Sequence, residues 1–527
     1  MHLNDEMNEK SDNGGLSSSG GASVPASRTR RDQAMRKRLV SSLASPGEIS
    51  PADIDRSCCV PLLALFGGAA LWLVVGSVLG LMASIKFHAP DFLANCACLT
   101  YGRLQPAADD ALLYGFCLPA GLGVALWLLA RLSRTPLRGA VVPIVAANLW
   151  HLGVLVGLAA ILIGDSTGFA WLEFPRGGSV PVFFAYLLLA SWAMMIFAGR
   201  RDRALYPSHW FLVTALFWFP WIYSTANLFL VARPVRGVAQ AVIGWWFADN
   251  LLVVWTGLIG LGAAFYFLPK FARRPLQSHY LALFAFWTFI LFATWCGIPP
   301  GAPVPVWMPT LSAVAAAWLL VPLLAVFLVV WLTVRGSIMS NWNNTPFCFI
   351  GAGIDSFLLS GLMLMAMACP QISRVTDFTW FGPAETQLRL YGFFAMTLFG
   401  AAYYVLPRAV GVEFPFPKLA RAHFWLALLG VTLLVAPLAI GGVVQGLKLQ
   451  NSGVAFADST KAMLPFLRVS TTGLLLLLLG NLLFLVNVMG LTLRWKFALL
   501  KQFIAFLKSP LEADPAATGS GGREVRT

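Results

Sequence analysis

Residues 242–268 read VIGWWFADNLLVVWTGLIGLGAAFYFL, an almost uninterrupted apolar stretch in which Asp249 is the single charged residue. About 20 such residues in an α-helix span the hydrocarbon core of a bilayer, so the stretch predicts a transmembrane helix. An ionisable side chain inside such a helix is energetically costly, which makes Asp249 a candidate functional residue. The stretch therefore indicates both a membrane fold and a first candidate site.

The composition of the whole chain also favours a membrane protein. Hydrophobic residues make up 58% of the sequence and charged residues only 11%, which excludes an ordinary soluble domain and a disordered chain. Apolar stretches recur with short breaks, so we predict an all-α polytopic membrane fold of about twelve transmembrane helices. The expected spans are Pro61–Ile85, Ala111–Ala130, Val141–Ile163, Val180–Ala198, Trp210–Val231, Val242–Leu268, Tyr280–Trp295, Leu311–Val334, Phe347–Met367, Leu388–Leu406, Phe424–Ile440 and Val469–Met489.

Basic residues concentrate in short loops between the apolar stretches. The formal net charge of +14 therefore indicates how the chain is oriented in the membrane. A nucleic-acid-binding protein would instead gather its basic residues on one face. Loops such as 131–138 and 270–274 fall on the same side as the basic N-terminal tail, so the positive-inside rule predicts that both termini are cytoplasmic. We expect a membrane domain at 56–507 between disordered tails at 1–55 and 508–527.

Several motifs occur in collinear order along most of the chain. They include LTYGRLQP at 99–106, WWFADN at 245–250 and GAAYYVLPR at 400–408. From about Asp53 to Met489, the chain resembles subunit I of the haem-copper respiratory oxidases, specifically the cbb-type or C-family. The shorter stretches that share this resemblance are Ile54–Cys58, Ser84–Leu93, Tyr266–Lys270, Pro303–Pro305 and Tyr391–Phe393.

The resemblance implies a defined set of cofactors. Such oxidases hold a low-spin haem b between two histidines, and beside it a high-spin haem whose histidine-bound iron faces a copper with three histidine ligands. Imidazole suits both metals because its neutral nitrogen offers a lone pair. The whole chain, however, contains only six histidines, which are His2, His88, His151, His209, His279 and His423.

The resemblance matches the family's ligands to residues of other types. The haem ligand positions fall on Ala108, Glu385 and Gln387, the copper positions on Asp249, Pro299 and Pro300, and the redox tyrosine on Ala293. A methyl group cannot bind iron, and a peptide proline nitrogen has no lone pair to give to copper. The sequence therefore predicts that this chain holds no haem, no copper and no other metal.

Three functions follow as alternatives. The first is a redox-inactive paralogue, a pseudoenzyme with a structural or assembly role in a respiratory complex. The second is an active terminal oxidase subunit, oxidising cytochrome c, reducing oxygen and pumping protons through unrecognised ligands. The third is a proton or ion transporter that uses Asp249 and Glu385. Asp249 is either a functional residue or, as we favour, the partner of Arg389 in an intramembrane charge pair. Glu385 is either a functional residue or a carboxylate that water solvates at the outer interface.

The expected surroundings of the chain follow from the same resemblance. They are membrane lipid, other membrane subunits of a respiratory complex and a c-type cytochrome subunit as a candidate partner, with no nucleic acid, in a bacterial inner membrane. Loss of two haems would leave voids that cost about 24 cal/mol per Å³ of cavity. Side chains, lipid, collapse of the helices or another ligand must therefore fill the space, and the abundant Phe and Trp favour aromatic side chains.

Overall fold

The computed structural model describes residues 49–202 and 204–508. Most of the expected N-terminal tail and residues 509–527 of the expected C-terminal tail lie outside this part of the chain. Within it, the expected disorder of residues 51–55 is not found, because they form helix α2 (Pro51–Ser57). Asp55 in this helix accepts a hydrogen bond from Nε1 of Trp127 at 2.9 Å, which ties α2 to the membrane domain.

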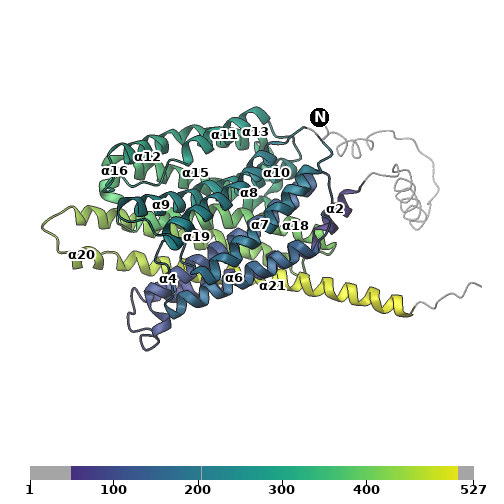
Figure 1. Cartoon of the computed structure of the whole chain (residues 1–527), viewed down its shortest axis with the longest axis horizontal. Coiled ribbons are helices and arrows are strands. Elements are labelled where there is room, and N and C mark those ends of the chain that lie inside the picture. The colour runs from purple at the N-terminus through teal and green to yellow at the C-terminus, as the bar shows by residue number, and fades with distance from the viewer. Residues whose placement is uncertain (1–48, 203, 509–527) are drawn as a thin grey trace, which may run out of the picture.

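The fold is all-helical, and its helices run side by side as one long bundle (Figure 1). Eleven helices in the described residues are long and apolar enough to cross a membrane. Some are single α-helices, namely α3 (Cys59–Ile85), α6 (Val141–Ile163), α7 (Arg176–Ala198), α15 (Thr345–Ala368) and α19 (Pro417–Leu449). The others join segments, namely α4 (Tyr101–Asp110) with η2 (Ala111–Cys117) and α5 (Leu118–Leu132), α8 (Pro207–Ala226) with η3 (Asn227–Ala232), α9 (Val238–Asp249) with η4 (Asn250–Trp255) and α10 (Thr256–Ala272), α12 (Trp307–Trp318) with α13 (Leu320–Val334), α17 (Phe381–Gln387) with η5 (Leu388–Ala395) and α18 (Met396–Val410), and α20 (Phe456–Lys461) with α21 (Leu464–Lys508).

The predicted membrane fold is confirmed, with one difference in the count of spans. The segment expected at Tyr280–Trp295 forms α11 (His279–Ala293), which has only 15 residues and is shorter than the eleven long helices. The chain then turns at Gly297, whose φ of +95° lies in the left-handed region that favours glycine. The remaining short helices are η1 (Ala97–Leu99), α14 (Ile338–Asn341) and α16 (Pro370–Thr376).

Three spans form the centre of the bundle. In Tyr101–Leu132, Val238–Ala272 and Phe381–Val410, 94% of the most apolar window is buried inside the protein, against 39–50% in the other eight. Central helices are apolar on every side because they contact only other helices, whereas the outer helices also face lipid. The three central spans are also the ones that carry the expected haem positions and the Asp249 position.

Each central span changes to a π-helix at the same relative place. The π-helical segments η2, η4 and η5 begin at Ala111, Asn250 and Leu388, directly after the α-helical turns that contain Ala108, Asp249 and Gln387. A π-helical segment is rare and occurs frequently at functional sites. The expected site residues thus lie where the backbone departs from regular α-helix.

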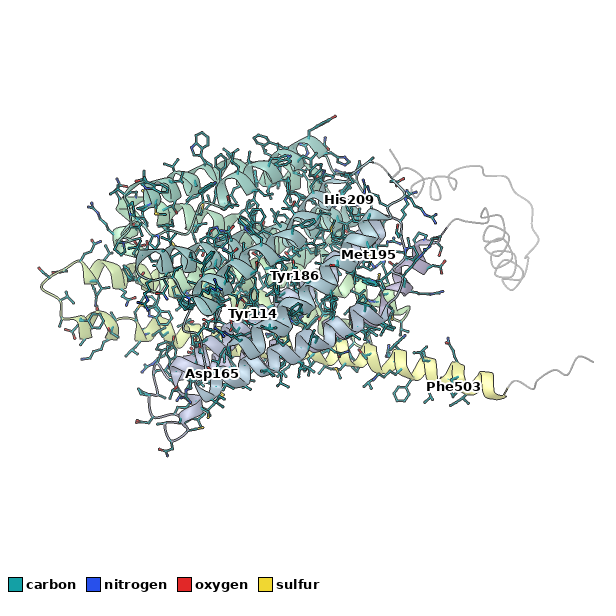
Figure 2. All side chains as sticks on the ribbon, viewed as in Figure 1. Tyr114, Asp165, Tyr186, Met195, His209 and Phe503 are labelled. Carbon is teal, nitrogen blue, oxygen red and sulfur yellow. The ribbon has the colours of Figure 1, made fainter. Side chains whose placement is uncertain are left out.

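Aromatic side chains are the largest completely buried residues of the interior, and Figure 2 labels two of them, Tyr114 and Tyr186. Trp127, Trp150 and Trp255 are completely buried, and the indole of Trp255 donates a hydrogen bond to the hydroxyl of Tyr186 at 3.0 Å. The ring of Tyr186 in turn stacks on Phe219, with 4.3 Å between the ring centres. Large apolar rings supply much buried area, and a hydrogen-bond partner for each polar tip removes the cost of burying it.

Candidate functional site

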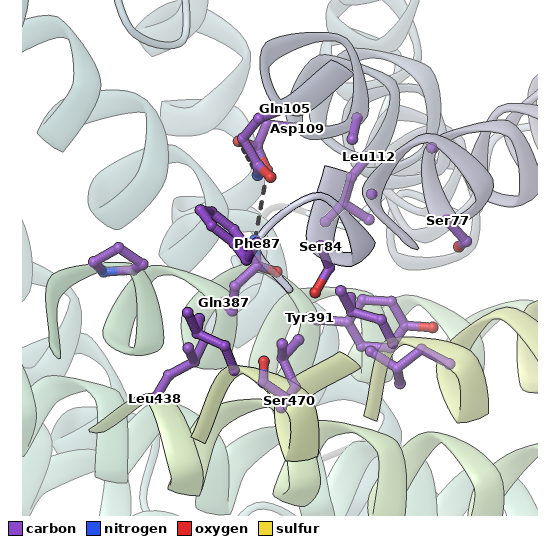
Figure 3. A pocket seen from close by; sticks show the side chains of 18 of the residues that line it. Ser77, Ser84, Phe87, Gln105, Asp109, Leu112, Gln387, Tyr391, Leu438 and Ser470 are labelled. Carbon is purple, nitrogen blue, oxygen red and sulfur yellow. Dashed lines mark hydrogen bonds between the residues drawn. The ribbon is translucent and has the colours of Figure 1, made fainter. Parts of the chain in front are cut away.

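The structure brings Ala108 and Gln387 to the wall of one cavity. The cavity has a volume of about 110 Å³ and lies among α3, α4, α17, α19 and α21. Figure 3 shows Gln105, Asp109 and Gln387 gathered at one part of its lining. Two positions that the family resemblance assigns to haem ligands, far apart in sequence, therefore meet at one place in the fold.

A carboxylate and two amides form the polar part of this cavity. Oδ2 of Asp109 accepts a hydrogen bond from Nε2 of Gln105 at 2.9 Å, and its Oδ1 accepts one from Nε2 of Gln387 at 3.5 Å (Figure 3). Gln387 is thus an amide donor to a carboxylate from another span. Nearby, the Tyr391 hydroxyl donates to Oδ1 of Asn481, whose Nδ2 donates to Oγ of Ser77.

The residues of this cavity do not fit a haem held by two histidines. Its lining contains no histidine, cysteine or methionine, which are common axial ligands of haem iron. Tyr391 is of a type that binds haem iron in some proteins, but here its hydroxyl is used by Asn481. The lining therefore supports no chemical step through haem.

A second group of expected residues gathers around Asp249 at the end of α9. A Cβ added to Gly297 would lie 2.5 Å from Cβ of Asp249, so the loop backbone after α11 packs directly on this side chain. Pro299 and Pro300 follow in the same loop. The positions assigned to the three copper histidines therefore come from two segments that are in contact, although none of the three offers an imidazole.

The ion pair at this centre differs from the expected one. Arg389 is paired with Glu385, and within residues 49–202 and 204–508 no ion pair joins it to Asp249. The reason is helical spacing, since residues four apart lie on the same side of a helix. Asp249 is near enough to interact electrostatically with both. Its Oδ2 atom is buried without a hydrogen-bond partner.

Of the two alternatives for Glu385, solvation by water at the outer interface is wrong. The span begins at Phe381, earlier than the predicted Leu388, so Glu385 is part of the helix. Its neighbours leave it only 7% exposed. A buried carboxylate needs a partner in place of water, and the guanidinium of Arg389 supplies it. The centre consequently holds two carboxyl groups and one guanidinium.

These residues do not fit a copper site with three histidine ligands. In the part of the chain that the structure describes, no group of three or more His, Cys, Asp and Glu side chains is arranged to hold a metal ion. Ala293, the position matched to the redox tyrosine, is completely buried at the end of α11 and carries no hydroxyl. The geometry therefore provides no step through copper either.

The described histidines are distributed over the fold. His88 lies in the loop after α3, His151 is within α6 with its Nε2 3.2 Å from the backbone oxygen of Ala64, and His209 accepts from the backbone N–H of Tyr206 at the start of α8. The remaining two are His279 at the start of α11 and His423 in α19, whose Nδ1 is 3.1 Å from the Tyr403 hydroxyl. His2 lies outside the described residues.

One pair of acidic residues was missed by sequence reasoning. Asp110 is completely buried, and its carboxyl group interacts with that of Glu173, from the loop between α6 and α7. Burial raises the pKa of Glu173 to about 7. The sequence did carry a signal for Asp110, because two adjacent aspartates, Asp109 and Asp110, directly precede an apolar stretch. It was missed because the predicted span started only at Ala111.

The sequence matches one known protein family over most of its length. Residues 61–476 match the family described as "Cytochrome C and Quinol oxidase polypeptide I". This match covers well over half of the chain. The chain belongs to this family. The predicted resemblance is therefore confirmed at the level of oxidase subunit I, and membership implies membrane partners in a respiratory complex.

Relatives of this subunit I family member include bacterial oxidase subunits. The chain is 26% identical over 446 residues to cytochrome c oxidase subunit 1 of Rhodobacter capsulatus, covering 79% of this chain and 82% of the relative. It is 23% identical over 413 residues to the Cbb3-type cytochrome c oxidase subunit CcoN1 of Stutzerimonas stutzeri, covering 75% and 86%. The chain is thus a distant, multi-pass relative of cbb-type subunits.

The fold of the family member is also found among solved structures. A cryo-EM structure of a heme-copper terminal oxidase dimer superposes with a TM-score of 0.66 at 16% sequence identity, covering 82% of this chain and 84% of the other. At this identity the likeness establishes the shared fold alone.

Proposed function

We propose that this subunit I homologue is a redox-inactive paralogue that holds neither haem nor copper and has a structural or assembly role in a respiratory membrane complex. The observation that carries the proposal is the meeting of Ala108 and Gln387 at one cavity without a ligand for iron. The side-chain amide of Gln387 donates a hydrogen bond to Asp109. A histidine at this position that bound iron would direct its ring nitrogen to the metal.

The second centre supports the same proposal through its charges. Metal ions are often the largest positive charges in their sites, so a site without them must balance its carboxylates in another way. The guanidinium of Arg389 pairs with Glu385 and lies within electrostatic reach of Asp249. A fixed side-chain cation in this place balances carboxylate charge in the way that a metal ion would.

The proposed setting is a bacterial inner membrane with both termini in the cytoplasm, other respiratory subunits as neighbours and a c-type cytochrome subunit as a candidate partner. The basic loops at 131–138 and 270–274 favour this orientation under the positive-inside rule. Capture of the tagged chain from its native membrane tests the partner: we expect other respiratory subunits to co-purify in a fixed ratio. Recovery of the chain alone, under mild detergent, would contradict the structural role.

An oxygen-consumption assay tests redox inactivity. The purified chain, supplied with reduced cytochrome c, is expected to consume oxygen no faster than the detergent buffer, with a purified cbb-type oxidase as the positive control. Turnover by the purified chain would instead favour the alternative of an active terminal oxidase whose ligands the family resemblance does not identify.

A proton or ion path is a second candidate function, favoured by one observation. Oδ2 of Asp249 is buried and unpartnered, and two carboxyl groups face one guanidinium, so the centre has room for one more positive charge. A transporter predicts that Asp249→Asn abolishes flux into proteoliposomes, while Asp458→Asn in exposed α20 does not. The redox-inactive structural role predicts no flux through the unmodified protein or through either variant.

A further inference from the structure

A second cavity lies at one end of the bundle. Its volume is about 510 Å³, within the roughly 300–1,000 Å³ that is typical of ligand sites. Its walls are the loop between α5 and α6 and the end of α7, together with Ile49, which precedes α2. Figure 2 labels Met195, one of its lining residues, near the end of the bundle from which α21 projects. The cavity shares no lining residue with the one that contains Ala108 and Gln387, so it is a separate candidate site.

Hydrogen bonds hold the two walls of this cavity together. Nε1 of Trp192 in α7 donates to the backbone oxygen of Arg138 at 2.8 Å, and Oγ1 of Thr135 donates to the backbone oxygen of Gly199 at 2.9 Å. Gly139 has a φ of +64°, and a Cβ added there would lie 3.0 Å from the indole of Trp192, so the loop packs closely on this ring. The loop and the end of α7 therefore form one frame around the cavity.

Positive charge is in excess around this cavity. Arg138 and Arg201 line it. The two segments that form its walls, 133–140 and 199–202, contain several arginines and a single acidic residue, Asp202, which forms an ion pair with one of them. Helix α6 begins beside the cavity without a side-chain cap, so the partial positive charge of its N-terminus adds to that of the arginines. The cavity is therefore suited to an anion.

Apolar side chains form the rest of the site. Pro136 and Met195 line the cavity beside the indole of Trp192, a residue type enriched at membrane interfaces. Met195 is 52% exposed, and Val141 and Val145 in the first turns of α6 are 70% and 54% exposed. On membrane-spanning helices such exposed apolar side chains contact lipid tails. A small soluble anion would gain nothing from these apolar groups, whereas a ligand with a charged head and an apolar tail would use both parts of the site.

We propose that this cavity binds the phosphate group of an anionic phospholipid. Arg138 and Arg201 supply guanidinium donors to the phosphate oxygens, and the acyl chains follow the exposed apolar side chains of α6 and α7 into the bilayer. Basic pockets between transmembrane helices, close to one membrane surface, are suited to anionic headgroups. The site is independent of the central spans, so it does not rest on the loss of haem and copper.

Native mass spectrometry of the full-length protein tests this proposal. The protein is incubated in detergent with equal amounts of phosphatidylglycerol and phosphatidylcholine, and the lipids that stay bound are counted. We expect phosphatidylglycerol to be retained about tenfold or more in preference to phosphatidylcholine, because the arginines favour an anionic headgroup. Equal retention of the two lipids would overturn the proposal.

Glycerol 3-phosphate distinguishes a lipid from a free phosphate. It carries the phosphate group without acyl chains, so we expect that a large excess leaves phosphatidylglycerol bound. Displacement of the lipid by glycerol 3-phosphate would overturn the proposal, because it would show that the apolar part of the site contributes nothing to binding.

Two arginine substitutions supply the matched control. Arg138→Gln should weaken retention of phosphatidylglycerol by about fivefold, the contribution of one basic residue at an anionic surface. Arg273→Gln removes the same charge from the loop after α10 and should leave retention unchanged. Both arginines are exposed, and Trp192 binds only the backbone of Arg138, so neither substitution disturbs the packed bundle. Equal losses in the two variants would overturn the proposal, because they would indicate a response to overall charge.

Discussion

Arg389 forms a buried ion pair with Glu385, one helical turn earlier in the same central span. Only 3% of the Arg389 side chain and 9% of the Glu385 side chain are exposed. The pair lies beside Asp249, in the centre that the family resemblance assigns to copper. Its energetics therefore report on how the charges at this centre are balanced.

Arg389→Met should strongly destabilise the protein. Removing one partner of a buried ion pair leaves an uncompensated charge and typically costs about 3–5 kcal/mol. Thermal unfolding in detergent measures the loss, and Arg389→Met combined with Glu385→Gln should recover much of it. Arg134→Met, in an ion pair with Asp202 whose side chains are 53% and 50% exposed, is the control and should cost no more than about 1 kcal/mol. Similar losses for the two methionine variants would contradict the role of the buried pair.

Gly297→Ala tests the contact between the loop after α11 and Asp249. A methyl group at this position meets Cβ of Asp249 at 2.5 Å and must also adopt a φ of +95°, so we expect a clear loss of thermal stability. Gly411→Ala is the control, because Gly411 also has positive φ but has no atom within 4 Å of the added methyl. Backbone strain alone should cost about 1–2 kcal/mol, and overpacking at Gly297 about 1–3 kcal/mol more.

The stability of the protein should fall as pH rises from about 4.5 to about 7. Burial raises the pKa of Glu173 from its ordinary value of 4.5 to about 7. A carboxyl group with a raised pKa stabilises the fold while protonated, and this contribution is lost as pH rises through the folded-state value. Glu173→Gln should flatten the unfolding temperature across this pH range, and Glu413→Gln, in an exposed loop, should not. An unchanged slope in Glu173→Gln would refute the assignment.

Much of the fold could be predicted because membrane helices have a strong sequence signal. The stretch at 242–268 corresponds to the observed span at Val238–Ala272. Predicted ends were less accurate where polar residues extend a helix inside the bundle, as at Asp109, Asp110 and Glu385. Hydropathy alone treats such residues as exposed, whereas here other helices cover them.

The family resemblance identified Ala108 and Gln387 as positions matched to haem ligands, but the hydrogen-bond partner of Gln387 was not predicted. Gln387 binds Asp109, which the predicted spans left outside the membrane. Pairing of Arg389 with Glu385 follows from four-residue spacing within one helix, a local signal that was available in the sequence. The contact of Gly297 with Asp249 required the three-dimensional packing.

Haem and copper content of the purified full-length chain tests the central claim most directly. We expect the reduced-minus-oxidised spectrum to show no low-spin haem and elemental analysis to show copper well below one atom per chain, measured beside a cbb-type oxidase purified in the same way. A stoichiometric haem signal with one copper per chain would contradict the account.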